Sequence, residues 1–334
     1  MKPYVKKTLQ AVKTTYVKAV ELIKGAFNTW PKAFLGVVAA LIIGYYPLGG
    51  KVSERIDRTE DYDFSSVPEK QLQGIEAISF LIDREVNQHI WTPNLPFFFP
   101  AYSLDNMPNF QIGIIRGVKN VVFGLSKQVK CAENQKAATY LSDAAKLLAY
   151  PERVWLVSPN NKLKMAASST SQYRKARKKL KNFNQALNNE ECFWVRNEKS
   201  LYLINQQVIK GLKTARRQLE NQIREGNNSW FDTKADDVFY LNQGRLYAYM
   251  ITLKKIGRDY KQVLMADNLY QDWTAAIRAL QNGAEINPDV VLNGKTNGTF
   301  MANHLMSLGF YATKTENVLM KINARLKEES TDAN

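Results

Sequence analysis

Apolar residues recur at helical spacing along most of the chain after residue 65. The first such stripe carries Leu72, Ile75, Ile78, Ile82 and Val86, each three or four positions after the last. Comparable stripes cover 110–125, 133–149, 173–187, 201–219, 236–256, 267–282 and 302–328. Residues three and four apart share one face of a helix, so these stripes predict a bundle of helices. Strand-like alternation is short, "CFWVR" at 192–196 being the best case, and the fold class we expect is all-α.

Local signals indicate where several of these helices begin and end. Ser66 and Glu69 have the spacing of a capping box in front of the first stripe. Gly257 and Gly283 follow two later stripes, at the position where a glycine commonly ends a helix.

Residues 33–50, "AFLGVVAALIIGYYPLGG", differ from the rest because they contain no charged side chain. At the helical rise, eighteen residues extend about 27 Å, close to the hydrocarbon thickness of a bilayer. Trp30 precedes the segment and Tyr45 and Tyr46 lie near its end, as is typical of membrane surfaces. We expect a single transmembrane helix at 33–50. A cleaved signal peptide and a buried core helix are the alternatives.

Charge is distributed unevenly around this segment. The chain carries a formal charge of +15, of which residues 1–32 contribute seven lysines against one glutamate. Residues 51–65 hold three basic residues and five acids. Since the more basic flank stays in the cytoplasm, the N-terminus is expected there. The chain is then a single-pass protein of a bacterial inner membrane: a cytoplasmic basic amphipathic helix (1–32), the transmembrane helix, a charged stalk (51–65) and an all-α periplasmic domain (66–334).

Two features near the N-terminus bear on membrane binding and self-association. From Val5 to Trp30, apolar residues are spaced alternately by four and three, with lysines on the other faces. This predicts either a helix lying on the anionic inner leaflet or a seam between helices. Gly36, Ala40 and Gly44 form a small-residue stripe in the apolar segment, which favours a homo-oligomer in the membrane.

Cysteine usage agrees with an oxidising compartment. The chain has two cysteines, Cys131 and Cys192. Outside the cytoplasm such a pair is a candidate disulfide, and two separate buried thiols are the alternative because sequence does not give their distance.

A proline-rich stretch at 93–108 interrupts the helical pattern. Prolines fix the backbone and remove hydrogen-bond donors, so the stretch is expected to be a stiff loop. It presents a candidate plug or partner surface made by Phe97, Phe98, Phe99, Asp105 and Asn106. We favour the plug: at least one ring fills the helical core, and Asp105 or Asn106 bonds the backbone of the turn. Docking onto a partner is the alternative.

The stretch "RKARKKLK" concentrates positive charge on one helix whose other face is apolar. Its basic residues are candidates for binding an anionic partner: Arg174, Lys175, Arg177, Lys178, Lys179 and Lys181. Nucleic acid is the usual partner of such a patch, but the inferred compartment argues against it. An anionic glycan, a lipid head group or an acidic envelope protein remain, beside a merely solvated face.

No reaction follows from the sequence. Two histidines, His89 and His304, and two cysteines do not make a typical zinc motif, and HExxH, P-loop, GxSxG and GxGxxG patterns are absent. No metal, cofactor or catalytic residue is therefore assigned. Asp236 and Asp237 are interpreted as acids at a helix start, and both histidines as structural.

Four segments carry a resemblance to a known family: "DNMPNFQ", "SQYRKA", "ADDVFYLNQGRLYA" and "NGKTNGTFMANHLMSLGFY". They resemble the uncharacterised bacterial membrane-protein family called domain of unknown function twenty-three thirty-three. The resemblance implies a single-pass inner-membrane protein and supplies no catalytic residues. The leading hypothesis is a structural or interaction role in the cell envelope. The alternatives are an envelope enzyme acting on glycan and a lipid-handling helical domain.

Overall fold

The computed structural model describes residues 14–24, 31–54, 56–131, 134–156, 166–226, 232, 234–294 and 302–332. The chain divides into two compact units, one of residues 1–54 with 97–103 and one of residues 55–96 with 104–334. The described residues form helices and two isolated bridges, with no β-strand among them. The predicted all-α fold is confirmed.

The larger unit is built around two helices, α4 (Asn106–Leu125) and α9 (Ala235–Asp259). Every residue of α9 from Asn242 to Ile251 is buried, because α3, α4, α8 and α11 all pack against this helix. Because α9 is covered on all sides, it forms the centre of the core, and its charged side chains need partners inside the protein.

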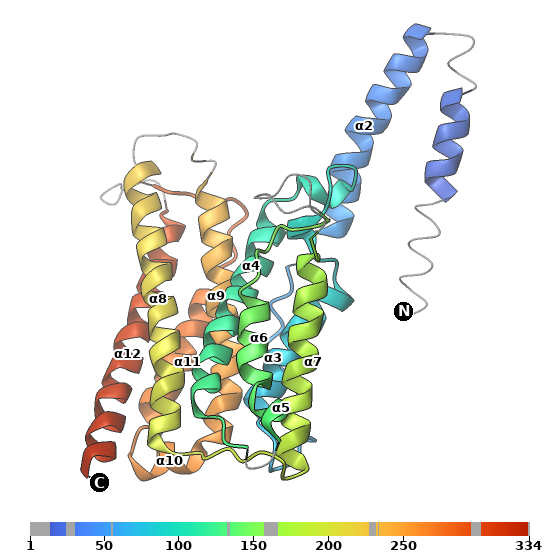
Figure 1. The fold of residues 1–334 in the computed structure, drawn as a ribbon. Coiled ribbons are helices and arrows are strands. Elements are labelled where there is room, and N and C mark those ends of the chain that lie inside the picture. Colours follow the sequence, from blue (N-terminus) through green and yellow to red (C-terminus); the bar gives the residue numbers. More distant parts are fainter. Residues whose placement is uncertain are drawn as a thin grey trace. The chain divides into compact units, whose positions relative to one another are not determined.

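Two groups of helices pack on this central pair (Figure 1). One group holds α8 (Glu198–Gly226), α11 (Tyr270–Ala284) and α12 (His304–Asp332). The other holds α3 (Gln73–Asp83), α6 (Tyr140–Leu148) and α7 (Ser169–Asn188). The short helices α5 (Gln135–Ala138) and α10 (Lys261–Ala266) lie in the connections, as do turns at Arg84–Gln88, Thr92–Asn94, Pro100–Ser103 and Ser126–Gln128.

Glycines allow α4 and α9 to touch backbone to backbone. A Cβ on Gly113 would lie 2.1 Å from the carbonyl oxygen of Leu241, and one on Gly244 would lie 2.1 Å from that of Phe110. No side chain fits at either place without moving a helix. The close approach explains why these two helices form the best-buried pair of the unit.

Three of the predicted helix boundaries differ from the structure. Gly283 lies inside α11, which ends one residue later at Ala284. The other two are wrong for tertiary reasons. Ser66 and Glu69 lie before α3 rather than at its start. The first amides of α3 are capped by Asp259, whose carboxylate accepts from Gln73 N at 2.9 Å and Gly74 N at 2.8 Å. Gly257 lies inside α9, where a Cβ would come 2.3 Å from Trp273 Nε1. It makes room for an indole and does not end the helix.

The predicted stalk also differs, because its second half lies on the larger unit. The hydroxyl of Tyr247 donates to Thr59 O, Lys255 Nζ donates to Tyr62 O at 2.7 Å, and Phe64 is buried in the core. Residues 56–64 are therefore held against the helical bundle by hydrogen bonds and by the burial of Phe64, and do not form a free stalk.

The smaller unit contains a helix at residues 14–24, α2 (Pro31–Ser53) and the loop 97–103. The hydroxyl of Tyr45 donates to Phe98 O at 3.1 Å, and a Cβ on Gly49 would come 2.5 Å from Pro100 Cβ. The loop therefore packs on α2. Residues 1–13 and 25–30 of the predicted amphipathic helix lie outside the described residues.

The predicted plug is wrong. Phe97, Phe98 and Phe99 are 70%, 49% and 37% exposed, so none of the three rings fills the helical core. Asp105 does bond the chain as expected, since its carboxylate accepts from Asn106 N at 2.8 Å and caps α4.

Within the described part of the chain, no helix combines the length and the apolar character needed to cross a membrane. The transmembrane helix predicted for 33–50 stays a prediction.

Candidate functional site

The basic stretch predicted from the sequence lies along one wall of a groove. The groove has a volume of about 590 Å³ and is formed by α5, α6 and α7. Its lining residues are Lys136, Tyr140, Asp143, Lys146, Leu147, Lys175, Lys178, Lys179 and Asn182. With five lysines and one aspartate, this lysine groove carries a net charge of +4.

Only one of the five lysines is neutralised. Lys179 Nζ lies 2.8 Å from Asp143 Oδ2, and this hydrogen bond and charge hold the pKa of Asp143 below its usual range. Within the described chain, no ion pair or hydrogen bond involves the ammonium groups of the four others, Lys136, Lys146, Lys175 and Lys178. All four are exposed. The groove therefore presents four exposed ammonium groups to solvent, and its one carboxylate, Asp143, is already paired with Lys179.

The other predicted basic residues have structural partners. Arg174 Nε donates to Asn87 Oδ1 at 2.7 Å, and Arg177 Nη2 lies 3.2 Å from Asp83 Oδ2. Lys181 Nζ lies 3.7 Å from Glu76 Oε1. These three join α7 to α3 and the turn that follows it. The structure thus divides the predicted patch between helix packing and the lysine groove.

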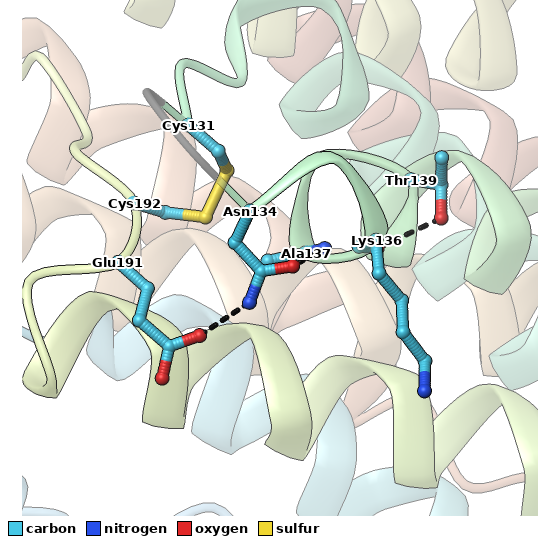
Figure 2. The surroundings of a disulfide bond; sticks show 7 residues. All are labelled: Cys131, Asn134, Lys136, Ala137, Thr139, Glu191 and Cys192. Atoms are coloured by element: carbon cyan, nitrogen blue, oxygen red, sulfur yellow. Dashed lines mark hydrogen bonds between the residues drawn. A yellow bond between two sulfur atoms is a disulfide. The ribbon is translucent and has the colours of Figure 1, made fainter.

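Cys131 and Cys192 form a disulfide with an S–S distance of 2.00 Å (Figure 2). Beside it, Phe193 N donates to Lys130 O at 2.8 Å. Asn134, the N-cap of α5, accepts from Ala137 N at 2.9 Å and donates to Glu191 (Figure 2). The two ends of the 131–192 segment are therefore tied together covalently and by hydrogen bonds.

Every residue lining the lysine groove lies between these two cysteines. The disulfide closes a segment with a sequence separation of 61 that contains α5, α6 and α7. The disulfide closes this loop whether or not a ligand is bound in the groove. The arrangement makes the groove a cross-linked part of the bundle.

A buried charge network, which the sequence analysis did not single out, lies next to α9. Arg84 is 2% exposed, and its guanidinium donates to Tyr247 Oη at 2.6 Å and lies 2.6 Å from Glu85 Oε1. Burial works against the charge, but Glu85, Tyr247, Tyr62 and Asp57 outweigh it and raise the pKa of Arg84. Burial also opposes ionisation of Glu85, yet His89 and Arg84 lower its pKa overall.

A π-helical turn at Arg84–Gln88 buries the side chains of Arg84 and Glu85 together. In a regular α-helix, successive side chains point about 100° apart, so Arg84 and Glu85 would not both face the interior of the bundle. The signal in the sequence is weak: three charged residues stand between Ile82 and Val86 of an apolar stripe. Gln111 completes the network, donating to Glu85 Oε2 at 3.1 Å.

The remaining candidates have structural partners. His89 Nδ1 is 3.4 Å from Glu85 Oε2, and His304 Nδ1 accepts from Leu292 N at 3.0 Å. Asp236 accepts from Asp237 N at 2.9 Å in the first turn of α9, and burial raises the pKa of both carboxyls. Among the residues that the structure describes, no cluster of histidine, cysteine, aspartate and glutamate could hold a metal ion.

In the small-residue stripe, a Cβ added to Gly36 or Gly44 would meet no atom within 4 Å. This face of α2 is therefore not used for packing at those two positions within the described chain.

Comparison with known proteins gives one family. The chain matches no curated protein and no solved structure. The model of a family described as "Uncharacterized protein conserved in bacteria (DUF2333)" matches residues 199–328. This range covers α8 to α12 and leaves the lysine groove and the disulfide outside it. Over residues 199–328 the chain is thus similar to an uncharacterised bacterial family, and the resemblance drawn from the sequence is confirmed.

Proposed function

We propose that the chain is a membrane-anchored protein of the bacterial envelope whose helical domain binds an acidic glycan in the lysine groove. The observation that carries this proposal is the set of four unpaired lysines around the Lys179–Asp143 ion pair. Unpaired like charges repel one another, so holding four of them around one groove costs stability unless an anion is bound.

The anchor is proposed from the sequence. Residues 33–50 have no charge, and the preceding 32 residues carry seven lysines. By the positive-inside rule this arrangement keeps the N-terminus in the cytoplasm and sends the larger unit to the other side. The disulfide between Cys131 and Cys192 supports the same compartment, since disulfides persist in oxidising spaces such as the periplasm.

The phenylalanine loop fits the membrane surface in this proposal. Its rings are exposed, and its backbone accepts a hydrogen bond from Tyr45, a residue expected at the outer interface. Exposed aromatic rings beside an interfacial tyrosine are suited to dipping among lipid head groups. In this proposal the phenylalanine rings contact lipid, and they do not fill the helical core of the same chain.

A glycan suits the lining of the lysine groove better than lipid or an acidic protein does. Asn182 offers an amide for sugar hydroxyls, and Tyr140 and Leu147 offer a small apolar surface. Lysine ammonium groups are point charges on flexible stems, which suits carboxylates spaced along a polymer. A lipid needs more apolar lining for its chains, and a protein interface needs about 800 Å² on each partner.

The lining of the lysine groove does not favour the alternatives derived from the sequence. The groove holds neither converging carboxylates nor a histidine, and apolar residues are a minority of those that line it. Converging carboxylates or a histidine would favour an enzyme, and a mainly apolar lining would favour a lipid carrier.

The test is binding of the full chain, in detergent, to a carboxylated polysaccharide such as polygalacturonate. We expect binding that weakens with salt, because exposed charges are screened. Replacing Lys175 and Lys178 by glutamine should lower the affinity roughly two- to thirty-fold, at about 0.2–1 kcal/mol for each exposed contact.

A matched control removes two exposed lysines elsewhere, Lys210 on α8 and Lys261 on α10, and should bind like the parent. Neutral dextran, polyglutamate and vesicles of anionic lipid serve as competing ligands. Equal loss in both double variants, or tighter binding to polyglutamate or vesicles than to the polysaccharide, would overturn the glycan assignment.

A further inference from the structure

A second cavity, separate from the lysine groove, lies between α4, α8 and α9. Its volume is about 310 Å³. Three basic side chains line it, Arg116, Lys119 and Arg245, together with one acid, Glu152. The net charge of its lining is therefore +2. One of these charges, that of Arg245, is almost completely buried.

The most informative side chain of this cavity is that of Arg245. It projects from the centre of α9 and is 3% exposed. Its Nη1 donates to Asn242 Oδ1 at 3.0 Å, to Gln218 Oε1 at 3.3 Å and to Gly211 O at 3.4 Å, all of them uncharged acceptors. Its Nε is buried and has no hydrogen-bond partner. Burial lowers the pKa of the guanidinium, yet arginine stays charged in proteins.

The one carboxylate of the cavity is already used. Glu152 Oε1 accepts from Arg116 Nε at 2.7 Å, and this partner outweighs burial and lowers the pKa of Glu152. Glu152 makes no ion pair with Arg245. A buried positive charge without a direct counter-ion is costly, so the neutral acceptors around Arg245 leave part of that cost uncompensated.

Lys119 adds a second unpaired charge on the α4 wall. Burial lowers its pKa, the charge of Glu152 offsets part of this effect, and the charges of Arg116 and Arg245 lower the pKa further. In the described part of the chain it has neither an ion pair nor a side-chain hydrogen bond. Two basic groups that repel each other thus face one small cavity.

We infer that this cavity binds a compact dianion of the phosphate type, as free phosphate or as a small phosphate monoester. A phosphate group carries close to two negative charges at neutral pH, which matches the excess of +2. The guanidinium of Arg245, the ammonium of Lys119 and the amide of Gln218 bring donors from three helices to the lining, which suits an acceptor with oxygens in several directions. The volume is at the lower end of the range for small-ligand sites and accommodates a monoester.

The site is independent of the proposed glycan groove, because the two share no residue. Half of its lining lies within the family match: Gly211, Thr214, Gln218 and Arg245 fall in 199–328. The other half comes from α4 and from Glu152, so the site depends on how α4 packs on α8 and α9.

The test is calorimetric titration of the full chain with inorganic phosphate, glycerol phosphate and succinate at constant ionic strength. We expect both phosphates to bind and Lys119→Gln to weaken that binding by at least about tenfold, the loss of one charge-assisted hydrogen bond. Lys261→Gln, which removes the same charge from an exposed position on α10 outside both cavities, should leave phosphate binding unchanged. A monoester binding more tightly than free phosphate identifies it as the ligand class.

A second readout separates a binding site from a water-filled cavity. Without phosphate, Lys119→Gln should raise the melting temperature, because burial of the charge and repulsion from Arg116 and Arg245 together outweigh the attraction of Glu152. With phosphate, the parent should gain more stability than the variant. The inference fails if a folded parent shows no binding at about 10 mM phosphate. It also fails if succinate binds in preference, or if Lys119→Gln and Lys261→Gln lose affinity equally.

Discussion

Removing the Cys131–Cys192 disulfide should lower stability without dismantling the bundle. The bond closes a segment with a sequence separation of 61, and the chain-entropy relation for a loop of that length gives about 4 kcal/mol. The folded state has other ties at the same place: the Lys130–Phe193 hydrogen bond and the packing of α6 on α4 and of α7 on α3. The loss therefore acts mainly through the unfolded chain, which gains freedom.

The assay is thermal unfolding of the full chain in detergent, followed by circular dichroism, for the parent and for Cys131→Ala/Cys192→Ala. For a unit of this size, about 4 kcal/mol corresponds to a fall in melting temperature of roughly 8–16 °C. Reductant should produce a similar fall in the parent and none in the double variant. A fall below about 2 °C in both experiments would refute the reasoning, because the loop would then be as constrained without the bond.

Four further outcomes follow from the structure. Gly244→Ala should lower the free energy of unfolding by about 2 kcal/mol or more, whereas Gly309→Ala, whose Cβ would have Leu219 Cδ1 at 3.9 Å, should not; equal effects would refute the backbone contact. Burial raises the pKa of Asp259 to about 6 from 3.8 although two amides donate to it, so the folded state holds this proton more tightly. The parent should therefore lose up to about 3 kcal/mol relative to Asp259→Asn as pH rises from about 4 to 6, and a constant difference in urea unfolding would contradict this. Replacing both glycines of the small-residue stripe by isoleucine should dissociate any oligomer seen by light scattering in mild detergent, and a monomeric parent would end that hypothesis. Phe98→Trp in vesicles should add fluorescence that brominated lipid quenches, and unquenched emission would place the loop away from lipid.

The pattern of apolar residues was enough for the fold class, because stripes of helical period determine which faces are buried. Boundaries depended on contacts that no local pattern contains. The start of α3 is fixed by Asp259, whose sequence position is 186 residues from Gln73. Gly257 resembles a helix end in sequence, yet the ring of Trp273 requires a glycine there.

The candidate sites divide in the same way. A basic run on one helix was visible, but its separation into helix-packing residues and groove residues depends on Asp83, Glu76 and Asp143 from other helices. The cavity around Arg245 could not be predicted, since its charges come from α4, α8 and α9 and from Glu152. At least one ring of Phe97–Phe99 was expected in the core, because burial inside the domain needs no partner molecule, whereas the loop packs on α2 with the rings outward.

The most direct test of the account is to identify what occupies the lysine groove in the cell. A photo-crosslinking amino acid would replace Lys178 in the groove and, as the control, Lys261 on α10, in living bacteria. The account predicts an adduct at position 178 that contains acidic sugar and disappears when Lys146 and Lys175 are changed to glutamine, with no such adduct at position 261. A protein or lipid adduct at position 178, or the same adduct at both positions, would contradict it.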